Sequence, residues 1–467
     1  MNSKELLSAQ TAVEKASAKA QGLIDGIVDA GSFVETDAFV VGAAFDSAET
    51  ALGEGVVTGY ASIEGTPVHI FAQNADVMKG SIGAASAKKI RKCIERACKS
   101  GTPLISVLDC SGARVDEGVS VMEAYADIIA AAADASDSIP HICVINGVAV
   151  GMSAAYASMA DYVLMSKNAV MSVNSPMYHA SKFSSVPKLN KIAGYEAYKS
   201  CGNVAQDVYS TNAELKGKIA ALFNVLNISD SEEDESDDDP NRIAPALSKA
   251  YGVDAALKAI CDDGKYLAYC DGWADDVRCA FTKVNGISTA VIATDSNVND
   301  GYVSEQGLEK ITSFIAKADA FGLPLVTLVD SKGVNPSLEE EVKGFSIKLA
   351  GVFKSMATYS HPMIGVACGN AIGVAYSALM SKAVGFDYTV ATAAAQIAPV
   401  TSETGVNVFY TEELKKGNSQ REKLEKLFAT DHASPLTAAK DGYLDNVIDA
   451  KNLRPYLSSA LMMLLGI

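Results

Sequence analysis

An internal repeat constrains this chain more than any other feature of its sequence. Five sites recur 221 positions later: Gly65, Lys89-Ile90, Pro103-Leu104, Asp109 and Gly112 reappear as Gly286, Lys310-Ile311, Pro324-Leu325, Asp330 and Gly333. After a slip of one residue, Gly147, Gly151 and Ala154 match Gly369, Gly373 and Tyr376. A repeat of this length indicates two fused domains of one fold rather than a solenoid.

The stretch 101–161 shows what each copy contains. Short apolar runs, glycine turns and helical segments alternate, and the first run ends at Asp109. This alternation is typical of an α/β core in which loops at the strand ends bind a ligand. The sequence also predicts a helix over 3–28, a hairpin over 55–73 with its copy over 277–293, and an apolar helix over 453–465 that docks on a core or a partner surface.

An acidic run separates the two copies. Residues 229–239 carry eight acids in a protein of net charge −17, and such a run repels itself. We interpret it as a solvated linker, with a regulatory or partner-binding role as the alternative. The predicted organisation is an N-terminal domain over 1–228, a linker over 229–243 and a C-terminal domain over 244–467. The acidic balance argues against a nucleic acid partner.

Composition favours a soluble, cytoplasmic protein. No apolar run reaches the roughly 18 residues of a spanning helix, and the N-terminal segment reads as a polar helix rather than a signal peptide. The nine cysteines include no C-x-x-C pair, so we expect neither a zinc ribbon nor a disulfide framework. Buried, reduced thiols are the expected state.

A basic segment stands out in this acidic chain. Seven basic residues and one acid lie between Lys79 and Lys99, beside a glycine loop and a predicted helix N-terminus. A phosphate ligand needs such a patch, whereas a solvated helix face explains it equally well. Both interpretations stay open from the charges alone. The equivalent helix of the second copy is more balanced, so phosphates are expected in the first half.

Two strand-to-helix turns, at 147–152 and 369–374, are the candidate sites of chemistry. Glycine at such a turn lets two backbone N–H groups point outward together and bind a developing oxyanion. A duplicated chain then offers two oxyanion holes, which suits chemistry between two enolate-like groups. The alternative is that these glycines serve only tight helix–strand packing.

The motifs together resemble the carboxyltransferase subunits of biotin-dependent acyl-CoA carboxylases, and the related alpha subunits of sodium-pumping acyl-CoA decarboxylases and transcarboxylase. The resemblance spans nearly the whole chain. It is carried by GVVTGY, GTPLISVLDCSGARVDEGV, GVAVGMSAAYASMADYV, GLPLVTLVD, GNAIGVAYSALMSK and DGYLDNVIDAKNLRPYL. It implies an α/β tandem of two crotonase-like (ClpP/crotonase) domains, with acyl-CoA bound mainly by the first domain and biotin by the second. The implied active site lies between the first domain of one subunit and the second domain of another.

The resemblance also implies site residues, cofactors and partners. The thioester oxyanion hole falls on the N–H groups of Gly151 and Met152, and the biotin hole on those of Val374 and Ala375. The implied cofactor-binding positions are Lys79, Gly80, Ser81, Ser111, Gly112, Ala113, Arg114, Gly147, Gly369 and Gly373. Biotin would arrive on a separate carrier, because no lysine stands in a Met-Lys-Met context. Coenzyme A thioester is the substrate and no metal is expected. The partners are a biotin carboxyl carrier protein, a biotin carboxylase or membrane decarboxylase subunits, and further copies of this chain as a dimer or hexamer.

The predicted function is transfer of a carboxyl group between carboxybiotin and the α-carbon of a short acyl-CoA, in a carboxylase or a decarboxylase. The family's paired glycines are here Gly151-Met152 and Gly373-Val374, and Glu403 replaces a family lysine. These departures motivate the alternative of a catalytically degenerate paralogue that binds acyl-CoA or scaffolds a complex. Hydrolysis is disfavoured because the position of a Clp-type nucleophile is Ala155. Hydratase chemistry would need a carboxylate, for which Glu117 is the nearby candidate.

Overall fold

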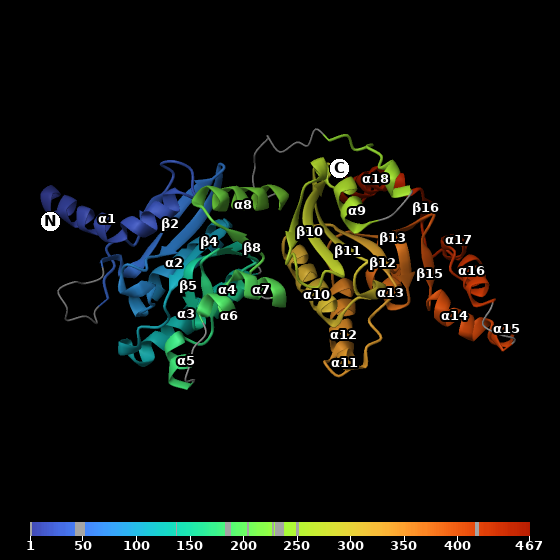
Figure 1. Cartoon of the computed structure of the whole chain (residues 1–467). Helices are drawn as coiled ribbons and strands as arrows, with labels where there is room; N and C mark the ends of the chain where they lie inside the picture. Colours follow the sequence, from blue (N-terminus) through green and yellow to red (C-terminus); the bar gives the residue numbers. More distant parts are fainter. Residues whose placement is uncertain are drawn as a thin grey trace. The chain divides into compact units, whose positions relative to one another are not determined.

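The computed structural model describes residues 2–42, 52–136, 138–182, 188–202, 205–226, 228, 238–248, 252–415 and 420–467. The chain divides into two compact units, with Met1–Asn224 in the first and Glu232–Ile467 in the second. Figure 1 draws the first unit from blue to green and the second from yellow-green to red. The predicted domain limits near 228 and 243 lie partly outside the described residues and stay a prediction.

The first unit is built on an eight-stranded sheet of order β1-β2-β3-β4-β5-β6-β8, with β7 paired to β5. Strands β1 to β3 are antiparallel, and the pairs from β3 onward are parallel. The strands are β1 (Val34–Thr36), β2 (Val56–Ile63), β3 (Thr66–Gln73), β4 (Leu104–Cys110), β5 (His141–Val150), β6 (Tyr162–Ser166), β7 (Val170–Ser172) and β8 (Asp207–Tyr209). The helices include α1 (Ser3–Asp25), α2 (Ala84–Ser100), α3 (Val119–Ser136), α4 (Met152–Met159), α5 (Pro176–Lys182), α6 (Leu189–Ala193), α7 (Tyr195–Cys201) and α8 (Asn212–Val225).

The second unit repeats this sheet in the order β16-β14-β13-β12-β11-β10-β9, with β15 paired to β13, which confirms the duplication. Its strands are β9 (Tyr266–Tyr269), β10 (Val277–Val284), β11 (Ile287–Thr294), β12 (Leu325–Ser331), β13 (Met363–Ile372), β14 (Tyr388–Thr392), β15 (Gln396–Ala398) and β16 (Asn446–Ile448). Its helices include α9 (Val253–Ile260), α10 (Glu305–Ala320), α11 (Leu338–Glu341), α12 (Phe345–Ala357), α13 (Val374–Leu379), α14 (Ser402–Phe409), α15 (Thr411–Leu414), α16 (Arg421–His432), α17 (Pro435–Lys440) and α18 (Leu453–Leu465). Both predicted hairpins, β2–β3 and β10–β11, are confirmed.

The duplication extends further toward the N-terminal end of each unit than the sequence matches indicated. The Asp29 carboxylate accepts the N–H groups of the β2–β3 turn, at 2.9 Å for Gly65, and Asp262 accepts that of Gly286 in the β10–β11 turn at 2.7 Å. A cation from the last helix of each described unit pairs with this carboxylate, Lys216 at 3.0 Å and Arg454 at 2.8 Å. Burial alone would raise the pKa of Asp29, but these hydrogen bonds outweigh it and lower the pKa to about 2.

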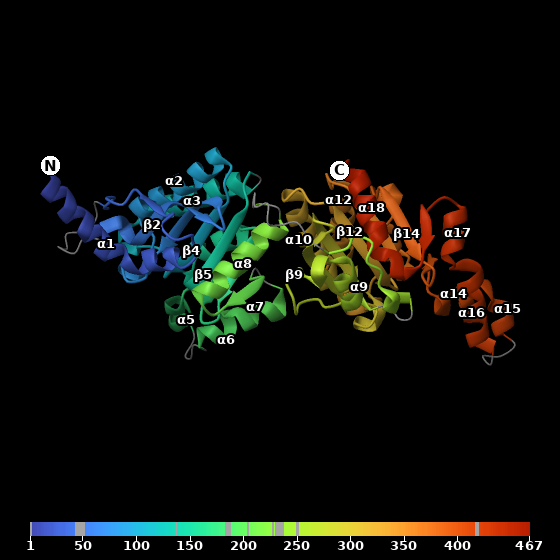
Figure 2. The same cartoon turned by 90° about the horizontal axis from the view of Figure 1, so that it is seen from above.

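Each sheet is covered by helices that bury its apolar runs. Helices α2, α3 and α4 pack on one face of the first sheet, and Figure 2 shows α2 and α3 together along it. Strand β4 reads LISVLDC and is buried at every position except Asp109, as expected for a strand covered on both faces. Helices α9 and α18 cover one face of the second sheet (Figure 1), which confirms that the last helix docks on a core. No helix in the described ranges is long and apolar enough to cross a membrane.

The end of the predicted linker is held against the second unit. Asp238 accepts hydrogen bonds from Arg242 at 2.8 Å and lies 3.3 Å from Arg454, which is itself buried. The backbone carbonyl of Asp239 accepts from Arg454 at 3.2 Å. Within the run the Asp238 carboxylate is therefore paired rather than solvated, because a buried arginine requires carboxylate and carbonyl partners, whereas Asp239 is exposed. Residues 229–237 of the run lie outside the described residues.

Candidate functional site

Two equivalent turns join a long central strand to a helix. Gly151, between β5 and α4, has φ +71°, and Gly373, between β13 and α13, has φ +54°, a region that favours glycine. The N–H of Gly151 is donated to the carbonyl of Ser172 at 2.9 Å, and that of Gly373 to the carbonyl of Ala398 at 2.9 Å. These two amides are therefore used within the fold. The prediction that Gly151 supplies an oxyanion donor is revised on this ground.

The two backbone N–H groups that follow each turn glycine are available to a ligand. Met152 and Ser153 begin α4, and Val374 and Ala375 begin α13, where the first N–H groups of a helix have no intrahelical acceptor. Within the described residues these four N–H groups have no hydrogen-bond partner. With the one-residue slip of the repeat, Met152-Ser153 is equivalent to Val374-Ala375. The two donor pairs thus occupy the same place in both units. Ser153 could have been found from the sequence, because the repeat, with its one-residue slip, matches it to Ala375.

Gly147 and Gly369 make room for a carboxylate. A Cβ on either glycine would overlap the carboxylate oxygens of Asp109 or Asp330, respectively. Asp109 accepts the N–H of Val148 at 3.1 Å, and Asp330 accepts the equivalent amide of β13 at 2.8 Å. Burial raises the pKa of the Asp109 carboxyl. Gly147 and Gly369 therefore serve tight packing against a carboxylate, which was the alternative interpretation of the turn glycines. The recurrence of Asp109 as Asp330 in the sequence indicates this role.

The predicted coenzyme-bordering loops lie side by side in the first unit. The N–H of Ile82 donates to the Gly112 carbonyl at 2.9 Å, the N–H of Arg114 donates to the Ile82 carbonyl at 2.9 Å, and the N–H of Ser111 donates to the Lys79 carbonyl at 3.1 Å. The second unit makes the same contacts between its loops at 301–303 and 332–335. This pairing brings together the predicted residues Lys79, Gly80, Ser81, Ser111, Gly112, Ala113 and Arg114.

Arg114 does not present its charge to a ligand. Its side chain is buried, forms an ion pair with Glu54, and donates to the Ser81 carbonyl at 3.1 Å. Glu117 lies 3.8 Å from the guanidinium and accepts the N–H of Ala84 at 2.7 Å, so it caps α2. The guanidinium is used within the fold, because a buried guanidinium needs these partners itself. Arg114 as one of the implied cofactor-binding positions stays a prediction, which its backbone rather than its charge would have to fulfil. The same contacts leave Glu117 with a structural role.

The basic helix is partly neutralised by the fold. Lys89 is buried, donates to the carbonyls of Gly53 and Val56 at 3.0 and 2.6 Å, and has a pKa lowered to about 8 by burial. Three other cations pair with acids: Arg91 with Glu95 and Asp127, and Lys92 and Arg96 with Asp37. Within the basic segment 79–99, all of which the structure describes, the exposed cations without an ion pair are Lys79, Lys88 and Lys99. Lys88 lines an open cavity of about 810 Å³ between α2, the start of α3 and residues 40–42.

Side chains beside the two donor pairs differ. Met152 is 45% exposed, so its side chain stands at the surface next to its own N–H. In the second unit, Gly373 borders a cavity of about 450 Å³ whose walls include Tyr376, His432 and Tyr443. Burial raises the pKa of the Tyr376 phenol. Glu403, which replaces the family lysine, is exposed on α14.

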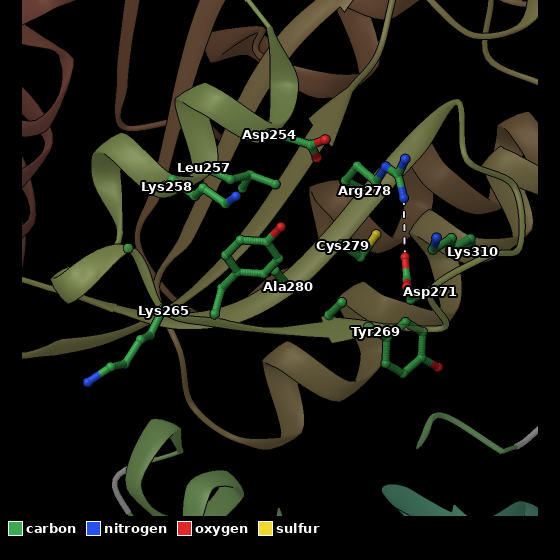
Figure 3. A pocket seen from close by; sticks show the side chains of 13 residues that line it. Asp254, Leu257, Lys258, Lys265, Tyr269, Asp271, Arg278, Cys279, Ala280 and Lys310 are labelled. Carbon is green, nitrogen blue, oxygen red and sulfur yellow. Dashed lines mark hydrogen bonds and ion pairs between the residues drawn. The ribbon is translucent and has the colours of Figure 1, made fainter. Parts of the chain in front are cut away.

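Two further clusters do not take part in the candidate site. Ser106 lies 2.8 Å from His141 Nε2 and 2.7 Å from the Tyr156 hydroxyl, and all three are buried at the far end of β5 from the donor turn. His141 is thus a satisfied structural histidine. A cavity of about 440 Å³ between α9 and β9–β10 is drawn in Figure 3, where Arg278 faces Asp271 at 3.2 Å. Lys310, which also lines it, donates to the Trp273 carbonyl at 2.8 Å.

Comparison with known proteins gives one family and consistent relatives. A family model described as "Carboxyl transferase domain" matches residues 15–466. The propionyl-CoA carboxylase carboxyltransferase subunit of Haloferax mediterranei is 28% identical, over 97% of this chain and 91% of that relative. The methylmalonyl-CoA carboxyltransferase 12S subunit of Propionibacterium freudenreichii subsp. shermanii is 30% identical, over 88% and 81%. A transcarboxylase 12S crystal structure with methylmalonyl-coenzyme A bound, described as a hexamer assembly, superposes with TM-score 0.90 at 26% identity, covering 99% and 95% of the two chains.

Proposed function

The chain belongs to the carboxyl transferase domain family, and we propose that it moves a carboxyl group between carboxybiotin and the α-carbon of a short acyl-CoA. Its two units are the two crotonase-like domains of that family. The observation that carries the proposal is the pair of equivalent turns, each with two helix-initiating N–H groups that have no acceptor among the described residues.

The backbone donors suit the charge that this reaction develops. When a carboxyl group leaves or joins the α-carbon of a thioester, negative charge collects on the thioester oxygen. Two fixed N–H groups at a helix N-terminus stabilise such an oxyanion, because they are oriented before the reaction begins. In this proposal Met152 and Ser153 bind the thioester oxygen, and Val374 and Ala375 bind the ureido oxygen of biotin. Carboxybiotin, held through its ureido oxygen by the amides of Val374 and Ala375, would supply the carboxyl group.

The coenzyme A moiety is proposed to lie along the first unit. The loops at 79–81 and 111–114 present backbone next to the donor turn, and Lys88 adds an exposed cation beside the cavity on α2. Most of the seven basic residues of 79–99 are buried or paired with acids. In this proposal the phosphates therefore bind Lys79 and Lys88 rather than the whole helix face. Backbone amides and a few lysines are sufficient partners for phosphate oxygens.

The degenerate-paralogue alternative rests on Met152, Val374 and Glu403. Replacing glycine by methionine or valine leaves the backbone N–H in place, and both donor pairs keep free amides in the described structure. Met152 adds bulk, but its side chain is 45% exposed rather than packed over the turn. The intact donors favour an active transferase over a scaffold.

Further copies of the chain and a separate biotin carrier are the proposed partners. Exposed apolar side chains stand at equivalent places in both units, Val115, Val119 and Met122 before and on α3, and Leu338, Val342 and Ile347 around α11 and α12. Exposed apolar sets of this kind mark interaction surfaces. Assembly that pairs unlike units of two copies would bury both sets and complete a site that needs both donor pairs.

Release of CO₂ from methylmalonyl-CoA and malonyl-CoA, with and without millimolar free biotin, tests this proposal. Biotin-dependent loss of the carboxyl group is the expected result, and the faster substrate indicates the acyl group. Binding of coenzyme A without biotin-dependent turnover would support the paralogue alternative instead.

A further inference from the structure

We propose that Tyr125 is a positioning residue for the acyl-CoA side of the site, holding the donor turn of the first unit through the hydroxyl of Ser153. The inference rests on the proposed function, because it concerns the amides that would bind the thioester oxygen. The proposed mechanism uses only backbone N–H groups, and this inference adds a side chain that orients one of them.

The contact joins α3 to the first turn of α4. The Tyr125 hydroxyl lies 3.2 Å from Ser153 Oγ, and the two side chains are only 4% and 2% exposed. The N–H of Ser153 is one of the two proposed donors. Because the anchored hydroxyl and the donor amide belong to one residue, fixing the side chain also restricts the direction of the amide.

The same phenol also contacts Cys110, the last residue of β4. Its oxygen lies 3.6 Å from Cys110 Sγ, and that sulfur accepts the N–H of Gly112 at 3.4 Å. Tyr125 therefore links the donor turn to the loop at 110–114. Burial raises the pKa of the phenol, so it stays protonated at working pH and acts as a hydrogen-bonding strut rather than an acid.

The second unit provides an internal comparison. Ala375 stands at the position of Ser153, so no hydroxyl is available there. Ser331, at the position of Cys110, uses its hydroxyl locally, accepting the N–H of Gly333 at 3.2 Å and donating to the Gly301 carbonyl at 3.1 Å. Apolar side chains, among them Leu349 and Val352, line the space next to Val374 and Ala375 instead. The polar anchor belongs to the first unit, so its loss should affect the acyl-CoA side and not the biotin side.

The substitution Tyr125→Phe removes only the hydroxyl. We expect kcat for biotin-dependent CO₂ release from methylmalonyl-CoA to fall about fivefold, the usual effect of losing one net hydrogen bond. The affinity for free coenzyme A and the KM for free biotin stay unchanged, because the lost contact touches neither. Ser153→Ala gives the same loss, and the double variant loses no more than either single one, since both remove the same bond.

Tyr156→Phe is the matched control. It removes another buried tyrosine hydroxyl, which is bound to Ser106 at 2.7 Å. Tyr156 lies on α4, as Ser153 does, but its hydroxyl bond is away from the donor turn. Both variants should lower the melting temperature by similar amounts, and only Tyr125→Phe should lower kcat. An unchanged kcat in Tyr125→Phe, or an equal loss in Tyr156→Phe, overturns the inference while leaving the proposed function intact. A wild-type protein without biotin-dependent turnover overturns both.

Discussion

Replacing Met152 by proline removes one proposed oxyanion donor without removing a hydrogen bond of the fold. The Met152 N–H has no partner among the described residues, and proline is well tolerated at the first position of a helix. Gly151, which precedes it, is the residue type that adapts most easily to such a neighbour. One oxyanion donor contributes about 2.7–4 kcal/mol to transition-state stabilisation. We therefore expect kcat to fall by about 10²–10³, with little change in coenzyme A affinity.

Met152→Ala is the matched control, because it removes the same side chain and keeps the N–H. Its kcat for CO₂ release from methylmalonyl-CoA with free biotin should stay close to that of the wild type. Thermal melts of both variants check that the fold is retained. Equal rates for Met152→Pro and Met152→Ala would refute the assignment of this amide as a donor.

Three further predictions concern the fold around the site. Gly147→Ala places a Cβ against the Asp109 carboxylate and should destabilise the protein by about 1–3 kcal/mol in a denaturant titration; unchanged stability would show that the carboxylate moves aside. Arg114→Leu leaves the buried Glu54 carboxylate without its guanidinium and should cost about 3–5 kcal/mol, measured in the same way. Asp29 has a folded pKa of about 2 against 3.8, so its contribution to stability is complete above the unfolded pKa and is lost as the pH falls through the folded value. Asp29→Asn should therefore lower the free energy of unfolding at neutral pH, and its difference from the wild type should vanish between pH 4 and pH 2, about the interval between the two pKa values; a constant difference would contradict this sign.

The repeat made the architecture predictable, because glycines and aspartates at strand ends are fixed by local geometry. Gly147 and Asp109 recur as Gly369 and Asp330 for a steric reason that acts equally in both units. The hairpins and the last helix followed from turn chemistry and apolar periodicity, which are local properties. The repeat at Asp29 and Asp262 was missed because its spacing differs from that of the later strands.

Charges were harder to interpret, because a sequence does not say which ones the fold uses internally. Arg114 lies in a motif that is typical of ligand binding, yet its guanidinium donates to Glu54, a residue sixty positions earlier in the chain. Lys89 belongs to a basic run but points into the core. Gly151 was assigned as a donor because the turn glycine is the visible signal, whereas only the paired strand β7 shows that its amide is taken.

Transfer of labelled carboxyl from methylmalonyl-CoA to free biotin tests the central claim most directly. The account predicts that label appears in carboxybiotin with the wild-type protein, and that Met152→Pro and Val374→Pro each reduce the rate strongly while coenzyme A still binds. Coenzyme A binding with no label transferred to biotin, under conditions where the chain is folded and assembled, would contradict it.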